Sequence, residues 1–111
     1  MGGLIRIRSK DQLNTILERN RDKLVVIYFE SKHVTFGSTM ATRYWKLAHA
    51  NPEVVCTIVE ATEAPEVAQH YGIRKFPSVK FIKEGLLKDG KVPEIIGYNK
   101  PALSAGIARY K

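Results

Sequence analysis

The run KLVVIYF, at residues 23–29, is the feature that most constrains the fold of this chain. Its β-branched and aromatic residues follow one another without polar alternation, which is typical of a central strand covered on both faces. A second such run, VVCTIVE, lies at residues 54–60, and a segment with a helical apolar stripe, MATRYWKLAHA at residues 40–50, separates the two. Strand, helix and strand in this order predict parallel strands with helices packed on the sheet.

The remaining segments extend this alternation over the whole chain. Ser9 or Asp11 can cap the first helix, and Gly72 is a signal for the end of the third. With 111 residues the chain has room for one domain, residues 1–111. The predicted order is β-α-β-α-β-α-β-β-α, an α/β three-layer sandwich with a mixed sheet. The other predicted segments are strands at residues 4–8, 77–85 and 91–98 and helices at residues 12–20, 64–72 and 100–111.

The chain is strongly basic, with 18 Lys and Arg residues against 11 Asp and Glu residues and a formal net charge of +7. This excess favours acidic partners, namely nucleic acid, acidic protein surfaces or anionic membranes. The basic residues form no run of five or more, so any basic patch must be assembled by folding. An electrostatic docking surface would be favoured if folding brought these residues to one side: Arg6, Arg8, Arg74, Lys75, Lys80 and Lys83.

The single cysteine, Cys56, lies within the second apolar run and is interpreted as a small core residue rather than a reactive thiol. It cannot form an internal disulfide, which fits a reducing compartment. The apolar runs are far shorter than the roughly 20 residues of a membrane-spanning helix. His33, His49 and His70 share no ligand spacing, so no metal site is predicted. We expect a cytoplasmic protein that binds no metal, cofactor or membrane.

Three stretches of the chain resemble the thioredoxin family. LVVIYFESK, at residues 24–32, resembles the strand that precedes the family's active site. VAQHYGIRKFPSVKFIKEG, at residues 67–85, is similar to the family pattern VAxxYGIxxxPTxxxFKxG, and GYNKPALSAGIARY, at residues 97–110, resembles the family's ending. The resemblance spans nearly the whole chain. It implies a thioredoxin fold with a cis peptide bond between Phe76 and Pro77.

The active-site motif departs from the family pattern. Disulfide exchange requires one thiolate that attacks and a second thiol that releases the mixed disulfide. Both of the family's cysteines are missing, and the turn is therefore a degenerate active-site turn. Residual chemistry through Cys56 is a minor alternative, because a thiol on an interior strand lacks the helix N-terminus that lowers a thiol pKa. The residues that align with the family's Trp-Cys-Gly-Pro-Cys are His33, Val34, Thr35, Phe36 and Gly37.

Two supporting positions have changed as well. The family's buried Asp aligns with Tyr28, and the Lys that often accompanies it aligns with Ile58. Removing one partner of a buried ion pair leaves an unpaired charge at a cost of about 3–5 kcal/mol, whereas replacing both can be neutral or stabilising. The chain is therefore interpreted as a natural non-redox descendant and not as an enzyme. Lys80 poses a separate question, because a Lys on a buried strand needs a carboxylate or a route to an edge.

The resemblance implies that three segments meet at the former active site: the degenerate turn, the cis-proline loop with Phe76 and Pro77, and the turn at residues 97–98. Thioredoxins bind extended segments at this surface, partly through main-chain contacts beside the cis-proline. An aromatic centre with a basic rim matches protein-binding hot spots. The same aromatic residues could instead serve packing, and the lysines could be solvated. The residues expected to bind a partner are Lys32, His33, Phe36, Arg74, Lys75, Phe76 and Tyr98.

The sequence therefore favours a non-catalytic binding or structural module that docks on an acidic protein assembly. Thioredoxin-like proteins without the cysteines occur in larger assemblies, and tubulin is an acidic lattice that suits a small basic domain. This hypothesis implies a cytoplasmic, cytoskeleton-associated location. The alternative is a component of a ribonucleoprotein or another nucleic-acid-binding complex, although no aromatic strand signature of an RNA recognition motif is present.

Overall fold

The computed structural model describes residues 3–32, 37–84, 92–97 and 99–111, and in them the elements follow the predicted order. A mixed sheet forms the middle layer, which confirms the three-layer α/β sandwich. The strands β1 to β5 span Leu4–Ile7, Val25–Glu30, Val55–Glu60, Ser78–Ile82 and Glu94–Ile96. The helices α1 to α4 span Lys10–Arg19, Gly37–Ala50, Pro65–His70 and Lys100–Tyr110.

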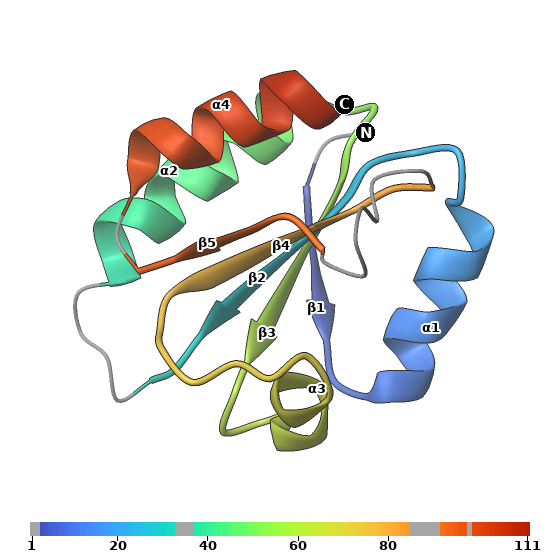
Figure 1. The fold of residues 1–111 in the computed structure, drawn as a ribbon, viewed down its shortest axis with the longest axis vertical. Coiled ribbons are helices and arrows are strands. Elements are labelled where there is room, and N and C mark those ends of the chain that lie inside the picture. Colours follow the sequence, from blue (N-terminus) through green and yellow to red (C-terminus); the bar gives the residue numbers. More distant parts are fainter. Residues whose placement is uncertain (1–2, 33–36, 85–91, 98) are drawn as a thin grey trace.

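The strands are arranged in the order β1-β3-β2-β4-β5. β1, β3 and β2 are parallel, whereas β4 runs antiparallel to both β2 and β5. Helices α2 and α4 cover one face of the sheet, and α1 and α3 lie on the other face (Figure 1). The carboxyl ends of β1, β2 and β3 therefore share one end of the sheet with the start of β4.

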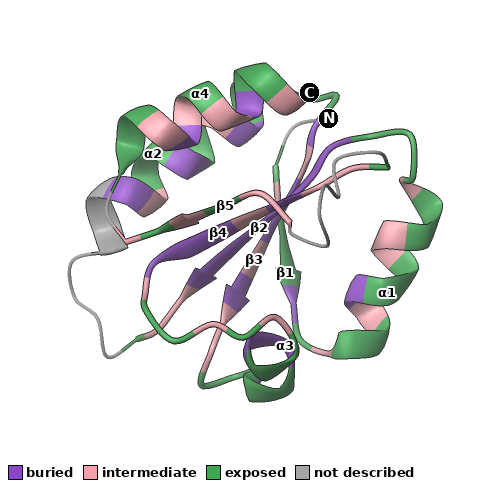
Figure 2. Ribbon diagram, viewed as in Figure 1, coloured by how far each residue is buried: buried purple, intermediate pink, exposed green. Residues whose placement is uncertain are grey.

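The central strand β2 is buried on both faces, as its continuous apolar run predicts (Figure 2). Val26 and Tyr28 face α2 and α4, while Val25, Ile27 and Phe29 face α1 and α3. The two apolar layers are called here the α2–α4 core and the α1–α3 core. The α2–α4 core consists of Leu24, Val26, Tyr28, Met40, Tyr44, Ala48, Val54, Cys56, Val79, Phe81, Leu103 and Ile107. The α1–α3 core consists of Ile7, Leu13, Val25, Ile27, Phe29, Val59, Ala64, Val67 and Ala68.

The ends of the elements follow most of the sequence signals. Ser9 caps α1, since its hydroxyl oxygen accepts a hydrogen bond from the Gln12 N–H (3.1 Å). Gly72 follows α3 with a φ of +66°, a conformation that glycine adopts without a Cβ penalty. Helix α2 begins at Gly37 rather than at residue 40. Of the strand predicted at 91–98, residues 91 and 98 lie outside the described part of the chain, and β5 begins after Pro93, which has no N–H to donate to a ladder.

Lys80 has a carboxylate partner. It lies opposite Glu94 in the register of β4 and β5, and its ammonium group forms an ion pair with the Glu94 carboxylate. The side chain of Lys80 is largely covered, whereas that of Glu94 reaches solvent. Of the two outcomes that the sequence left open, the structure therefore shows pairing with a carboxylate.

Four of the six basic residues considered for an electrostatic docking surface have partners within the chain. Arg6 donates two hydrogen bonds of 2.9 Å to the carboxylate of Glu63, and Arg8 lies 3.9 Å from the same carboxylate. The Lys83 ammonium donates to the main-chain oxygen of Lys111 (2.9 Å). Arg6 and Arg8 therefore share Glu63, whereas Lys80 and Lys83 have partners elsewhere in the chain. Arg74 and Lys75 remain exposed, without an ion pair to any described residue.

The packing of α4 on β4 leads to a first prediction, for Gly106→Ala. A Cβ at Gly106 would lie 2.5 Å from Cζ of Phe81, whose buried ring also packs against Tyr110. Exchanging a helical glycine for alanine normally gains about 1 kcal/mol, but overpacking of this kind costs about 1–3 kcal/mol. Urea denaturation should therefore show a less stable variant. Adding Phe81→Leu should recover part of the loss, and a stabilised single variant would contradict the packing.

Candidate functional site

The expected functional surface is partly within the described residues. Lys32 follows β2, the loop of residues 74–77 precedes β4, and Gly97 follows β5. The register pairs β2 with the start of β4, and β4 with the end of β5, so these segments meet at one end of the sheet. Gly37 is the first residue of α2. The other expected residues lie outside the described part of the chain: His33, Val34, Thr35, Phe36 and Tyr98.

A hollow of about 260 Å³, called here the cis-proline hollow, lies beside the loop that precedes β4. Ile73 and Ile96 give it an apolar part, and 58% of the Ile96 residue surface is exposed. Arg74 and Lys75 supply two exposed cations. This combination could take an apolar side chain next to an acidic one. The full lining consists of Gly72, Ile73, Arg74, Lys75, Ser78, Glu94 and Ile96.

The loop itself is fixed by main-chain contacts. The peptide bond between Phe76 and Pro77 is cis, as the resemblance implied. The Gly97 N–H donates to the Pro77 carbonyl (2.7 Å), and the Ser78 hydroxyl donates to the Lys75 carbonyl (2.6 Å). No described residue forms a hydrogen bond with the main-chain N–H or C=O of Phe76. These two groups can therefore pair with an extended segment of a partner.

The Phe76 ring has a structural role. It is half-buried and packs against the α1–α3 core. Packing, the alternative to partner binding that the sequence left open for the aromatic residues, therefore accounts for part of the ring surface. The ring anchors the loop to this core, while the neighbouring Arg74 and Lys75 are exposed. Phe76 is therefore a positioning residue for this surface.

The β3 side of the same end carries acidic residues. Burial favours the neutral form of Glu60, but hydrogen bonds from the Thr62 hydroxyl and from the main-chain N–H groups of Lys32, Thr62 and Glu63 outweigh it and lower the pKa to about 2. Burial, and then the charge of Glu60, raise the pKa of Glu30. Because these carboxylates adjoin Lys32, the basic character of the described part of this surface comes from Arg74 and Lys75 of the cis-proline loop.

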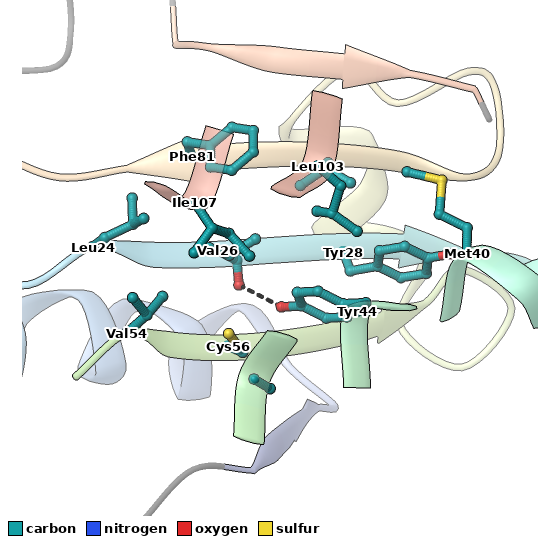
Figure 3. Close-up of a cluster of buried hydrophobic side chains, with 12 residues drawn as sticks. Leu24, Val26, Tyr28, Met40, Tyr44, Val54, Cys56, Phe81, Leu103 and Ile107 are labelled. Atoms are coloured by element: carbon teal, nitrogen blue, oxygen red, sulfur yellow. Dashed lines mark hydrogen bonds between the residues drawn. The ribbon is translucent and has the colours of Figure 1, made fainter. Parts of the chain in front are cut away.

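Beneath the start of α2, an aromatic pair fills the α2–α4 core. Tyr28 is fully buried and stacks on Tyr44, with 4.8 Å between the ring centroids and 14° between the ring planes (Figure 3). The Tyr44 hydroxyl donates to the carbonyl of Thr57 (2.7 Å) and, over a longer distance, to that of Val26 (3.2 Å). The pair ties α2 to the two central strands of the sheet.

Cys56 is a core residue in the same cluster (Figure 3). Only 1% of it is exposed, and burial raises the pKa of its thiol to about 11, although a hydrogen bond with Tyr44 partly opposes this shift. It lies four residues before Glu60, or about 13 Å along β3 from the candidate surface. The thiol is therefore neither ionised near neutral pH nor placed at the site.

The described residues contain no group of three or more His, Cys, Asp or Glu side chains arranged to hold a metal ion. None of the helices in the described ranges has the length and apolar character that crossing a membrane requires.

Comparisons with known proteins decide the family. Residues 5–109 match the family model described as thioredoxin. The chain belongs to the thioredoxin family. It is 28% identical to thioredoxin H-type 2 of Nicotiana tabacum over 98% of this chain and 91% of that protein, and 29% identical to thioredoxin of Callithrix jacchus over 94% and 95%. Among solved structures, Fasciola hepatica thioredoxin superposes with a TM-score of 0.85 at 26% identity, covering 96% of this chain and 98% of that one.

Membership of the thioredoxin family gives the buried tyrosine pair a clear context. Tyr28 and Ile58, which align with the family's buried Asp and Lys, are direct neighbours in the register of β2 and β3. Ile58 packs against the α2–α4 core that contains Tyr28. The site that carries a charge pair in the family pattern is therefore closed here by an aromatic stack and an aliphatic side chain.

Several residues of this surface were not identified from the sequence. Ile73 and Ile96 line the cis-proline hollow, and Glu60 organises the chain after β2 and β3. The sequence did offer a signal for Glu60. Glu30 directly follows the first apolar run and Glu60 ends the second, and parallel strands place these two residues side by side. Ile96 gave no comparable signal, because its exposure depends on how far α3 and its following loop extend over the sheet.

Proposed function

We propose that this thioredoxin-family chain is a non-catalytic binding module that docks an acidic, extended protein segment at the cis-proline end of its sheet. The observation that carries the proposal is the cis-proline hollow. It has an apolar part and two exposed cations, and it adjoins the loop in which the main-chain N–H and C=O of Phe76 are used by no described residue.

The cis-proline hollow and the loop beside it each have a matching part in such a partner. The N–H and C=O of Phe76 would pair with the backbone of the extended segment. Ile73 and Ile96 would contact an apolar side chain, and Arg74 and Lys75 would contact carboxylates beside it. Lys32 would add a third cation at the same end, although its surroundings include Glu60.

The absence of catalysis is part of the proposal. The chain contains one cysteine, so it cannot supply both the attacking and the resolving thiol of disulfide exchange. That cysteine is buried, with a raised pKa. A binding role uses the surface that remains at the former active site.

An acidic protein assembly suits the net charge of +7, and repeated sites on a lattice would add avidity to a modest single contact. Assembled tubulin is the lattice we propose to test first, with a cytoplasmic, cytoskeleton-associated location. The partner follows from charge, and the docking end follows from the cis-proline hollow.

Co-sedimentation with microtubules in rising salt tests this function. The wild-type chain should pellet at low salt, and the Arg74→Glu/Lys75→Glu variant should bind about tenfold or more weakly. The matched control, Arg21→Glu/Lys23→Glu, changes the net charge equally at exposed positions near the end of α1 and should bind more tightly than the first variant. Wild-type chain that stays in the supernatant at low salt, or equal losses in the two variants, would reject the proposal.

A further inference from the structure

The excess positive charge of the molecule is concentrated on the α2–α4 layer. Helices α2 and α4, together with Lys111, carry five of the 18 Lys and Arg residues and none of the 11 Asp and Glu residues. Only Lys111 among the five has an ion pair with a described residue, at 3.5 Å from Glu53. Both helices lie on the same face of the sheet (Figure 1), so their cations share one side of the molecule.

A second hollow, called here the α2–α4 hollow, lies on this layer and has a volume of about 270 Å³. Its lining consists of Thr42, Arg43, Lys46 and Lys100. Three cations and a hydroxyl line it, and none of the described lining residues is apolar. Because like charges at close range repel, an anion between the three cations would relieve an unfavourable arrangement. Phosphate offers several acceptor oxygens to such donors.

An exposed aromatic pair lies on α2, the helix that supplies Thr42, Arg43 and Lys46 to the hollow. Trp45 has 52% of its surface exposed, and the His49 ring meets it edge-on, with 4.4 Å between the ring centroids. Trp45 and Lys46 lie three and four residues after Thr42, and His49 lies four residues after Trp45 and three after Lys46, so the four residues occupy one outward stripe of the helix. A large aromatic ring on the same stripe as two lining residues of a cationic hollow offers stacking and phosphate contacts from a single helix.

We propose that the outer face of α2, with Lys100 from α4, binds single-stranded nucleic acid: phosphates contact Arg43, Lys46 and Lys100, and a base stacks on Trp45. Proteins that bind single strands without sequence preference combine a cationic groove with aromatic side chains in this way. An acidic peptide fits less well, because a peptide-binding hot spot needs an apolar hollow for an anchoring side chain. The described lining residues of the α2–α4 hollow offer no apolar anchor site, in contrast to Ile73 and Ile96 of the cis-proline hollow.

The sole tryptophan of the chain makes a direct assay available. Trp45 fluorescence should be quenched when a single-stranded oligouridylate is added to the full chain at low salt, because a stacked base quenches an indole. With three phosphate contacts, the logarithm of the binding constant should fall with the logarithm of the salt concentration at a slope of about −2. Absence of quenching at low salt, or quenching that is insensitive to salt, would overturn the proposal.

Two triple variants locate the binding site. Arg43→Gln/Lys46→Gln/Lys100→Gln should flatten the salt slope and weaken binding at least about tenfold. Its control, Lys10→Gln/Arg21→Gln/Lys23→Gln, removes one Arg and two Lys from exposed positions on α1 and after it, and should bind more tightly than the first variant. Equal losses in the two variants would overturn the assignment to α2. Circular dichroism should show that both remain folded.

A labelled oligonucleotide and a competitor complete the test. Trp45→Ala should lower the affinity for a labelled oligouridylate about tenfold, as expected for the loss of one stacked base. Polyglutamate that displaces the oligonucleotide equally well per charge would overturn the proposal in favour of an acidic peptide. None of these substitutions touches the cis-proline hollow, so failure here leaves the microtubule experiment unaffected, and the reverse also holds.

Discussion

Replacing Tyr28 by Asp is expected to lower the free energy of unfolding by about 4 kcal/mol or more at pH 7. Deleting a buried aromatic side chain costs about 3–5 kcal/mol, and burying a carboxylate without a cation adds to that cost. The neighbour of Tyr28 in the register of β3 is Ile58, which offers no charge. Since a domain of this size has about 5–15 kcal/mol of stability, urea denaturation should show a variant at the margin of folding.

The pH dependence of this variant has a definite sign. Burial raises the pKa of a carboxyl group, so the folded variant holds its proton to a higher pH than the unfolded chain does. Its stability relative to wild type should therefore be greatest below the unfolded pKa of about 3.9 and should decline as the pH rises above that value. Tyr28→Phe keeps the ring on Tyr44 and should cost about 1 kcal/mol, with no such pH dependence.

A double-mutant cycle separates the charge from the lost packing. Ile58→Lys places an ammonium group on the adjacent strand, so Tyr28→Asp/Ile58→Lys should be more stable than the sum of the two single changes predicts. The coupling would recreate the ion pair of the family pattern. Equal stability of Tyr28→Asp and Tyr28→Phe would contradict the closed apolar site described here.

Alkylation of Cys56 by iodoacetamide at pH 8 is expected to be at least about a thousandfold slower in the native chain than in the urea-unfolded chain. A thiol whose pKa is about 11 is ionised in only about one molecule in a thousand at this pH, whereas about a quarter of unfolded thiols are ionised. Burial adds a further factor, because the reagent must wait for the core to open. Mass spectrometry follows the reaction easily, since the chain can form only one adduct at cysteine.

The same experiment tests the alternative of residual redox chemistry. A native Cys56 that reacts nearly as fast as the unfolded thiol would be reactive in the fold and would support that alternative. Insulin-reduction assays of the wild-type chain and of Cys56→Ser provide the functional comparison. We expect no difference between them, because the thiol lies in the core and about 13 Å along the strand from the candidate surface.

The fold was largely accessible from the sequence because its signals are local. The apolar run at residues 23–29 became β2, covered on both faces, and the helical stripe at residues 40–50 became most of α2. The cis bond at Pro77 was accessible only through the family resemblance, since roughly one X-Pro bond in twenty is cis. The general preference of X-Pro bonds does not predict that the bond before Pro77 is the cis one.

The charges were harder to predict because their partners are distant in the sequence. Arg6 and Glu63 are 57 residues apart, and the partner of Lys80 depends on the register between β4 and β5. The sequence alone therefore did not show which of the six basic residues considered for docking have partners within the chain. The charge of the α2–α4 layer was visible in the sequence, because residues 37–50 and 100–111 contain no Asp or Glu. That these charges lie on one side of the molecule became clear only from the structure, which places the two helices on one face of the sheet.

The ion pair between Lys80 and Glu94 also bears on how the protein behaves at high concentration. β5 is an edge strand of three residues that follows Pro93, and it carries this charged pair across to β4. Short edges, proline and charges within the sheet all discourage strand addition by another chain. At the opposite edge, Arg6 of β1 is held by Glu63. Many copies could therefore crowd on one polymeric partner without joining sheet to sheet into fibres.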